Sequence, residues 1–578
     1  MLIKGLKHTW EYSREPSPQA ERLRSGLGCP SWVAAYLTGV GVRSREAALS
    51  WLDPRLGELP LPEDLPDLEE GVNRICAAID RQELIAVYGD YDVDGFTATF
   101  LLSDFLRRSG ARVVSYIPNR LVAGYGLHSA SIRELRSQGA ALLVTVDCGV
   151  ANHEQIEEAN RLGMDVVVTD HHLPSETLPP AAAVIDPKRL PSDHPLSNLA
   201  GVGVAFYVAL ALRSRLRGLG WYRSIDEPNL REYMDLLALG TVADMMPLQG
   251  VNRTLVRHAL HELARGSRIA LGALRQVIGH REEMVTPWDV HFRFAPRINA
   301  ASRMGRQDVI MDWLSSTLMK DACDLALQME DLNRKRVAIE EGVFREAIEG
   351  IERDDFHLTS QAIVLANRDW HAGILGIVAS RIVEKYRKPT ILLTWKNDHW
   401  EGSGRSIDGF HLHNALKHCA GHLERFGGHA VAVGLKVSQE NLQSFIRCFA
   451  ECIKNQGVDL LANEALPLHA SMPLSEINDA TIAWMERLGP FGHGCAEPVF
   501  WAESVDILRR DVIREQHVRL LLGQNGKRFS AIAFRMAQQF PAAVERLGAC
   551  IFVPMRKTWA GQKGIQLRVL DCVSPNGP

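Results

Sequence analysis

Runs of aliphatic residues, separated by segments of mixed polarity, dominate the chain from residue 71 to residue 305. Four of these runs have the length and composition of buried strands, at 84–88, 142–146, 165–169 and 233–242. Amphipathic segments with helical spacing, such as 129–136 and 153–162, lie between them. This alternation predicts an α/β unit built on a doubly wound parallel sheet.

A long helix is predicted after this unit. Residues 306–341 contain neither Gly nor Pro, and apolar residues recur every three or four positions. We expect this helix, within a connecting segment 306–349, to hold two domains apart. Residues 350–460 return to alternating patterns, with a strand at 361–366 and a helix at 375–386, and predict a smaller α/β domain.

The two ends of the chain have other patterns. Residues 461–578 contain about five short strands separated by turns, which predicts a small β domain. Residues 1–70 are rich in Pro, Arg and Glu, with helix-like pieces at 30–38 and 44–51. We expect this N-terminal extension to pack on the first α/β unit.

Composition narrows the class of protein. The 578 residues are 46% hydrophobic and 23% charged, which is typical of a globular protein with several domains. The N-terminus lacks the apolar stretch of a secretory signal, and no run of about eighteen apolar residues follows. We therefore expect a cytoplasmic protein without membrane association. The ten cysteines form no CxxC pair, so no zinc ribbon or redox motif is indicated.

Charge is distributed unevenly along the chain. The formal net charge is −4, but residues 501–578 hold twelve Lys and Arg against six Asp and Glu. This local excess of positive charge marks the C-terminal segment as the candidate surface for a polyanion such as a nucleic acid.

Acidic and imidazole side chains follow the predicted strands. The first strand runs into a turn with three alternating aspartates, Asp90, Asp92 and Asp94. The other strands end at Asp147, at the triplet Asp170, His171 and His172, and at Asp244. Because ligands bind at the carboxyl ends of strands in open parallel sheets, we expect these side chains to gather in one crevice.

Carboxylates at such close spacing repel one another and stay ionised together only if water or a cation compensates. Oxygen ligands favour Mg²⁺ or Mn²⁺, and an imidazole among them suits Mn²⁺ at least as well. The alternative interpretation of the first motif alone is a solvated acidic turn.

These motifs, in this order, resemble those of the DHH/DHHA1 phosphoesterase superfamily, and most of all the RecJ family of single-stranded-DNA-specific exonucleases. The resemblance extends through the segment Arg297-Ile298-Asn299-Ala300-Ala301-Ser302-Arg303 and the late Gly427-Gly428-His429. It implies a DHH catalytic domain at 71–305, a connecting helix at 306–349, a DHHA1 domain at 350–460 and an OB-like domain at 461–578.

The resemblance also implies roles for individual residues. Two metal ions would be held by Asp90, Asp92, Asp94, Asp147, His171 and Asp244, with Asp147 as the bridging carboxylate. His172 would donate a hydrogen bond to the scissile phosphate, and Asp170 would be either a ligand or an acceptor that fixes an imidazole tautomer. Arg303 would stabilise charge in the transition state. The residues expected to bind substrate are Arg120, Asn299, Ser403, Arg405, Gly427, Gly428 and His429.

The activity implied is 5′→3′ digestion of single-stranded DNA to 5′-mononucleotides in recombination and repair. A single-strand-binding protein and a repair helicase are the partners expected from the family, and the chain is expected to act as a monomer. Two alternatives remain open at this point. One is a DHH pyrophosphatase or oligonucleotide phosphodiesterase, and the other is an inactive DNA-binding scaffold.

Overall fold

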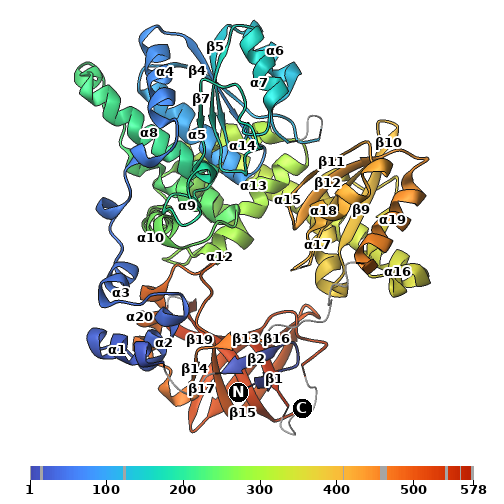
Figure 1. Cartoon of the computed structure of the whole chain (residues 1–578). Coiled ribbons are helices and arrows are strands. Elements are labelled where there is room, and N and C mark those ends of the chain that lie inside the picture. Colours follow the sequence, from blue (N-terminus) through green and yellow to red (C-terminus); the bar gives the residue numbers. More distant parts are fainter. Residues whose placement is uncertain are drawn as a thin grey trace.

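Three folded bodies make up the molecule. This computed structural model describes residues 2–12, 17–121, 125–407, 409–455, 465–540, 544–559 and 562–574. Figure 1 shows an α/β body that contains the first sheet, a smaller α/β body joined to it by a long helix, and a C-terminal barrel beneath them. The predicted boundary between residues 460 and 461 lies outside the described residues.

The first body is built on a parallel sheet with the strand order β4-β3-β5-β6-β7. Its strands are β3 (Leu84–Gly89), β4 (Arg112–Tyr116), β5 (Ala140–Val146), β6 (Asp165–Thr169) and β7 (Ala183–Ile185). One face packs on α4 (Leu68–Asp80), α5 (Val93–Arg108) and α8 (Gly201–Gly218), and the other packs on α6 (Ser129–Ser137) and α7 (His153–Arg161). Helices on both faces of a parallel sheet confirm the predicted doubly wound fold.

One predicted strand is wrong. The apolar run 233–242 forms a helix, α9 (Met234–Ala243), whose residues from Met234 to Val242 are all buried. A run that is apolar on every side fits a buried helix as well as a buried strand, so its periodicity does not distinguish them. The helix still delivers Asp244 to the site, because Asp244 is its C-terminal capping residue.

The connecting helix also differs from the prediction. It is interrupted into α14 (Gln307–Leu314) and α15 (Met319–Arg353), with a break at the polar stretch Ser315-Ser316-Thr317. Ser and Thr compete with helical hydrogen bonds through their own side chains, which accounts for a break without Gly or Pro. The 35-residue helix α15 is the element that spans from the first body to the second.

The second body has a five-stranded sheet with the order β11-β12-β10-β9-β8. Its strands are β8 (Ile363–Ala366), β9 (Thr390–Lys396), β10 (His399–Arg405), β11 (Arg425–Gly428) and β12 (Ala432–Val437). Helices α17 (Leu375–Tyr386), α18 (Leu412–His418) and α19 (Leu442–Asn455) cover it. The predicted strand and helix at the start of this domain are confirmed.

The C-terminal body is a closed barrel of β15 (Phe500–Ile513), β16 (His517–Gln524), β17 (Lys527–Ala533), β19 (Gln562–Val573) and β18 (Arg546–Trp559). These strands follow one another around the sheet, and pairing of β15 with β18 closes it. This confirms the OB-like barrel.

The N-terminal extension packs on two bodies: residues 2–12 and 17–52 pack on this barrel, which was not expected, whereas Leu56, Leu59 and Leu65 pack on the first body as expected. Strands β1 (Leu2–Lys4) and β2 (Thr9–Tyr12) join β13 (Leu466–Leu468) in a small sheet. Helices α1 (Pro18–Leu27), α2 (Ser31–Gly39) and α3 (Arg45–Leu52) share one core with the barrel strands. The carboxylate of Asp571 accepts hydrogen bonds from the backbone of Leu6, Lys7 and His8. Because these contacts join residues near the two ends of the chain, no local sequence pattern predicts them.

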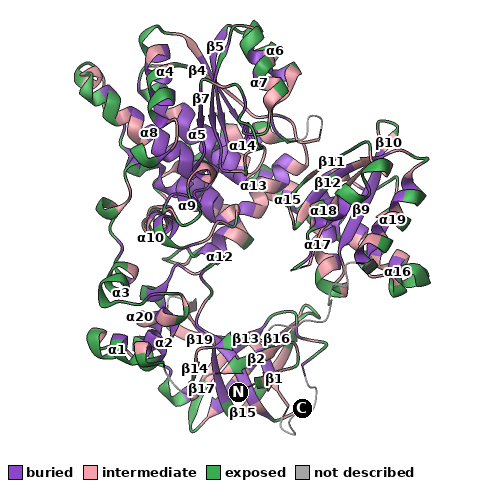
Figure 2. Cartoon of the chain, in the orientation of Figure 1, coloured by how far each residue is buried: buried purple, intermediate pink, exposed green. Residues whose placement is uncertain are grey.

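Burial follows these bodies, since the strands and inner helix faces of each are buried while its outer helix faces are exposed (Figure 2). Among the described residues, no helix has the length and apolar character needed to span a membrane.

Candidate active site

Three strands of the first sheet end side by side and place acidic or imidazole side chains at one edge. In the parallel register, Gly89 of β3 lies opposite Val146 of β5, and Val146 lies opposite Thr169 of β6. The residues that follow these strands are therefore neighbours, as the sequence predicts for parallel strand tips. They include the buried residues Asp90, Asp147, Asp170 and His171.

Two further aspartates come from the start of α5. Asp92 is the capping residue of this helix and accepts hydrogen bonds from the backbone N–H groups of Asp94 and Gly95. Asp94 lies in the first turn and accepts hydrogen bonds from Gly201 N at 2.6 Å and Val202 N at 2.9 Å, at the start of α8. Helix N-termini stabilise negative charge, so both carboxylates are placed where the backbone favours them.

The carboxylates and His171 form three overlapping groups whose donor atoms lie within 4.8 Å of one another in each group. The groups are Asp90 with Asp92 and Asp147, then Asp94 with His171 and Asp244, and finally Asp147 with His171 and His172. All six residues predicted as metal ligands are therefore brought together. Asp147 belongs to two of the groups, which agrees with the bridging position expected for it.

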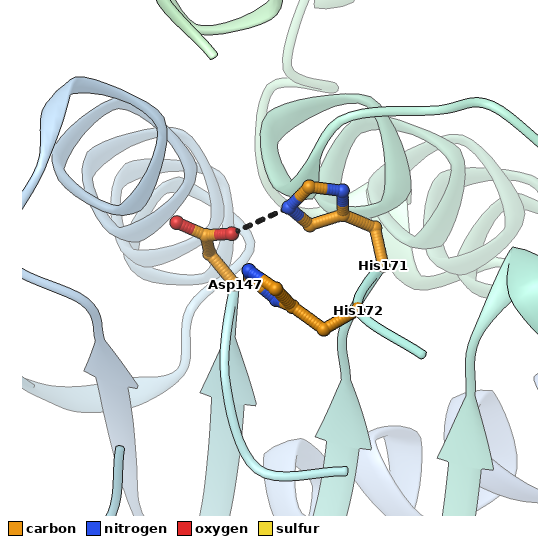
Figure 3. Close-up of side chains that lie close together, drawn as sticks. All are labelled: Asp147, His171 and His172. Atoms are coloured by element: carbon orange, nitrogen blue, oxygen red, sulfur yellow. Dashed lines mark ion pairs between the residues drawn. The ribbon is translucent and has the colours of Figure 1, made fainter. Parts of the chain in front are cut away.

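His171 lies at the centre of this cluster. Its Nε2 atom is 2.9 Å from Oδ1 of Asp147, 3.6 Å from Oδ2 of Asp244 and 3.8 Å from Oδ2 of Asp94. Figure 3 shows the ring of His171 pointing at Asp147, with His172 beside it. Asp147 itself has a φ of 60°, in the left-handed region, at the turn where β5 ends.

Burial and mutual repulsion disfavour the negative charge of the cluster. Burial, with the charge of neighbouring aspartates added, raises the pKa of Asp94 to about 7 and that of Asp244 to about 9. The same two causes raise the pKa of Asp90 and of Asp147. Burial also lowers the pKa of His171 to about 3, so its imidazole is neutral and keeps a lone pair for a ligand.

These residues fit divalent cations. Oδ1 of Asp90, Oδ1 of Asp147 and Nε2 of His171 are buried and form no hydrogen bond among the described residues, although the last two atoms face each other at 2.9 Å. Buried polar atoms are normally satisfied, so three orphaned atoms in one cluster indicate that something else pairs with them. Carboxylate oxygens with one imidazole nitrogen are suitable donors for Mn²⁺ or Mg²⁺.

Asp170 stands apart from the metal donors. Its carboxylate accepts hydrogen bonds from the backbone N–H groups of Val150, His171 and His172, and it lies 2.8 Å from Nδ1 of His172. Its oxygens are therefore occupied by the turn and by His172. Of the two roles considered for Asp170, the geometry favours the acceptor that orients an imidazole.

His172 is held as a cation. Burial lowers its pKa, but the hydrogen bond to Asp170 and the charges of nearby aspartates outweigh burial and raise the pKa to about 9. The hydroxyl of Tyr125 lies 3.1 Å from the same nitrogen, Nδ1. The ring of His429, from the second body, is stacked on the ring of His172 with centroids 6.2 Å apart. The late Gly-Gly-His motif thus meets the strand tips across the two bodies.

Gly427 and Gly428 form the end of β11 and lead to His429. Gly428 has a φ of 126°, and a Cβ there would lie 2.4 Å from the backbone oxygen of Ala432. The turn that presents His429 therefore requires a residue without a side chain at this position.

Three arginines, Arg120, Arg303 and Arg405, gather near the acids. Nη1 of Arg303 donates to the backbone oxygen of Gly373 at 3.0 Å, and Nη1 of Arg405 donates to Oγ of Ser403 at 3.1 Å. The guanidinium of Arg120 lies over the ring of Tyr91, 4.5 Å from its centroid. Burial, with the charges of Arg120 and Arg405 added, lowers the pKa of Arg303 to about 9.

The positive charge of Arg120 reaches the acids, because it opposes the effect of burial that raises the pKa of Asp90. Across the segments that the structure describes, none of Arg120, Arg303 and Arg405 forms an ion pair. Beside them begins α17, where a Cβ at Gly376 would lie 2.7 Å from Nη2 of Arg405. Converging guanidinium groups at the start of a helix form a site for a phosphate or another anion.

Asn299 lies on α13 (Ala295–Arg303), and its buried Oδ1 has no hydrogen-bond partner among the described residues. Oγ of Ser302 on the same helix donates to the backbone oxygen of Tyr91 at 2.5 Å, which ties α13 to the turn that carries Asp90 and Asp92. Of the predicted substrate-binding residues, His429 lies beside His172, while Ser403, Arg405 and Arg120 lie near Arg303.

Sequence reasoning missed Asp186, Tyr125 and Gly201. Asp186 follows β7, so the rule that acids at strand tips share one edge would have found it. Burial raises its pKa to about 7, and its Oδ2 has no partner among the described residues. Gly201 touches Asp147, but no local pattern marks it.

An open parallel sheet with carboxylates and imidazoles at its strand tips, faced by a second α/β body, defines a phosphoesterase of the DHH class. The chain matches the models of the DHH family N-terminal domain at residues 84–241, the DHHA1 domain at 359–455 and the RecJ OB domain at 468–571.

Full-length relatives extend this match. The chain is 34% identical over 537 residues to the single-stranded-DNA-specific exonuclease RecJ of Haemophilus influenzae, covering 91% of this chain and 93% of the relative. It is 36% identical over 498 residues to RecJ of Escherichia coli, covering 83% and 85% of the two chains. A crystal structure of RecJ in complex with Mn²⁺ from Thermus thermophilus has a TM-score of 0.80 at 28% identity, covering 98% of this chain and 79% of the other. The chain belongs to the RecJ family.

Proposed function

We propose that this protein is a metal-dependent exonuclease that hydrolyses single-stranded DNA from its 5′ end and releases 5′-mononucleotides. The observation that carries the proposal is the buried cluster of Asp90, Asp147 and His171, with donor atoms that have no hydrogen-bond partner among the described residues, together with arginines contributed by both α/β bodies. The relatives are named single-stranded-DNA-specific exonucleases, and RecJ structures from Thermus thermophilus contain Mn²⁺ or Mg²⁺.

Two cations, when bound by Asp90, Asp92, Asp94, Asp147, His171 and Asp244, would neutralise the phosphate and lower the pKa of a bound water. The remaining groups act around them. His172, protonated and oriented by Asp170, donates a hydrogen bond to a phosphate oxygen. His429 approaches the same place from the second body. Fixed donors aimed at developing negative charge stabilise the transition state.

The arginine cluster provides a reason for acting at an end. Arg303, Arg405 and Ser403 form a closed anion site beside the start of α17, which suits the terminal phosphate of a strand. A phosphate held there would leave the next phosphodiester bond to the metal cluster. This arrangement accounts for release of single nucleotides from a 5′ end.

The cellular setting follows from the same proposal. Processing of single strands belongs to DNA recombination and repair, in the cytoplasm. The expected protein partners are a single-strand-binding protein and a repair helicase that expose or deliver the strand, and the enzyme is expected to act as a monomer.

The alternative activities have less support. Pyrophosphatase or small-oligonucleotide activity does not account for the C-terminal barrel, which matches the RecJ OB domain. An inactive scaffold does not account for a complete set of acids and imidazoles with orphaned donor atoms.

The proposal is tested with oligonucleotides labelled at the 5′ or the 3′ end, single-stranded or double-stranded, with Mn²⁺ or with a chelator. The expected result is early release of labelled mononucleotide from the 5′-labelled single strand, only when Mn²⁺ is present. Hydrolysis of pyrophosphate without attack on DNA, or binding of DNA without release of nucleotide, would overturn it.

A further inference from the structure

Two aromatic side chains stand exposed on the segment that leads into α13. Trp288 is 47% exposed and Phe292 is 55% exposed, although both are large apolar residues. Their ring centroids lie 5.1 Å apart with planes inclined by 38°, and the ring of His291 meets Phe292 edge-on at 4.7 Å. These three rings, of Trp288, His291 and Phe292, lie on one surface that we call the aromatic step.

The local backbone explains why these rings face outward. Helix α12 (Pro287–Asp289) runs directly into the π-helical turn η6 (Val290–Phe294), which continues as α13. Val290 and Phe294 are fully buried, so this face of the segment packs on the core. Trp288 and Phe292, four residues apart, fall on the opposite face. Single π-helical turns are rare and are frequent at functional sites.

The aromatic step lies between the active site and the barrel. In one direction the segment continues as α13, which carries Asn299 and Arg303. In the other direction Glu282 forms an ion pair of 3.1 Å with Lys557 of the barrel strand β18. Figure 1 likewise shows α12 on the side of the first body that faces the barrel.

The acids near the aromatic step are already paired. Glu282 lies 3.1 Å from Lys557 and 3.5 Å from Arg293. Asp289 lies 3.4 Å from Arg293 and accepts a hydrogen bond from Oγ1 of Thr286 at 2.6 Å. Their negative charge is thus compensated within the protein, and it does not repel a phosphate backbone passing over the rings.

We propose that the aromatic step is a stacking site for bases of the single strand, between the catalytic cluster and the barrel. This inference rests on the proposed function and adds the place where the strand is held. Exposed aromatic rings bind bases of any sequence because every base has a π-face, as a sequence-independent exonuclease requires.

The position of the step sets the length of strand that reaches it. Fifteen residues of nearly continuous helix separate Trp288 from Arg303, or about 20 Å at the helical rise. At a stacked spacing of about 3.4 Å, a strand anchored at the arginines reaches the rings within about six nucleotides. Shorter substrates would be hydrolysed without touching them.

The test measures KM and kcat on single-stranded oligonucleotides from two to about sixteen nucleotides. Trp288→Ala and Phe292→Ala should each raise KM about 5- to 100-fold on the long strands, the range expected for loss of one base stack. Neither should change KM on dinucleotides, and kcat should stay within about twofold on all substrates.

Three controls separate stacking from other causes. Trp288→Phe and Phe292→Tyr keep a ring and should retain the KM of the wild type, whereas Phe292→Leu keeps only apolar surface and should behave like Phe292→Ala. Phe356→Ala removes a ring that is 42% exposed on α16 (Asp355–Thr359), in the second body, and should have no effect.

An unchanged KM on long strands in both alanine variants would overturn the inference while the proposed function stands. Equal loss on dinucleotides and long strands would also overturn it, because the rings would then serve the fold or the catalytic cluster. If the wild type releases no nucleotide from any strand, the proposed function is wrong, and the inference that rests on it is wrong as well.

Discussion

At the scale of single residues, Asp170 organises the turn after β6. Its carboxylate accepts backbone hydrogen bonds from His171 in this turn and from Val150 after β5, and it holds Nδ1 of His172 at 2.8 Å. His172 is thereby fixed in orientation and kept protonated, with Nε2 free to face a phosphate. A buried acid without a metal thus contributes to the chemistry through its neighbour.

Replacement of Asp170 by Asn tests this role. Asn keeps the size but loses one acceptor and the charge, so we expect kcat to fall about 10- to 100-fold while KM changes little. Steady-state kinetics on single-stranded DNA give both constants. Asp165→Asn, at the exposed start of β6, is the matched control and should be close to wild type. A normal kcat for Asp170→Asn would show that His172 needs no such support.

Arg405 serves as a second test at this scale. With Ser403 and Arg303 it forms the proposed terminal phosphate site, so Arg405→Ala should reduce the preference for a 5′-phosphorylated strand about tenfold or more. Competition between phosphorylated and unphosphorylated oligonucleotides measures the preference. Arg447→Ala, on the exposed face of α19, is the control. Equal loss on both substrates would contradict a phosphate clamp.

At the scale of elements, α8 supports the site through its first residue. The N–H of Gly201 donates to Asp94, and a Cβ at this position would lie 2.6 Å from Cβ of Asp147. The close approach of the helix to the strand tip therefore requires glycine at this position. Gly218, the last residue of the same helix, has no atom within 4 Å of its ideal Cβ.

These two glycines make a matched pair. Gly201→Ala should displace Asp147 and lower kcat about 100-fold, since a shift of about 1 Å in a catalytic group has this effect. Gly218→Ala should leave kcat unchanged and stabilise the fold slightly, by less than about 1 kcal/mol. Kinetics and thermal denaturation of both variants test this. Full activity in Gly201→Ala would mean that Asp147 tolerates movement.

Many of the strands and helices were predictable from the sequence, but some were not. The strands β3, β5 and β6 and the acids after them followed from short aliphatic runs that end in charged residues. Helix α9 was assigned as a strand because it is buried on all sides and shows no helical periodicity. The break before α15 depends on Ser and Thr, which interrupt some helices and not others.

At the scale of the whole molecule, Arg253 joins the first body to the barrel. It is buried on α10 (Gly250–Arg265) and donates to the backbone oxygens of Leu488, Gly489 and Pro490, which lead into the barrel. It also donates to Trp51, at the end of the N-terminal helices. Arg253 thus joins the first body to the barrel, together with Arg257, which donates to the backbone oxygens of Arg487 and Gly489.

The N-terminal segment illustrates why this scale escaped sequence analysis. Its packing on the barrel depends on contacts such as that between Leu6 and Asp571, 565 residues apart. Hydrophobic periodicity indicates whether a segment is a helix or a strand, but not which distant element packs on it. The contacts of Arg253 with Leu488 and Gly489 likewise join distant parts of the chain.

Removal of this joint should weaken the whole assembly. Arg253→Ala leaves several buried carbonyl groups without a donor and should destabilise the protein by about 3 kcal/mol, with greater cleavage in limited proteolysis near residues 488–490. Arg265→Ala, on the exposed end of the same helix, should change stability by less than about 0.5 kcal/mol. Equal stability of the two variants would contradict a joint at Arg253.

The central claim is that acids and an imidazole from separate strand tips hold divalent ions that hydrolyse DNA. The most direct measurement is the rate of nucleotide release from single-stranded DNA in Mn²⁺ by Asp147→Ala, with DNA binding followed in parallel. Because Asp147 belongs to two of the three donor groups, we expect release to fall to the background seen for the wild type with a chelator, while binding persists. Mn²⁺-dependent release at a rate close to that of the wild type would contradict the account.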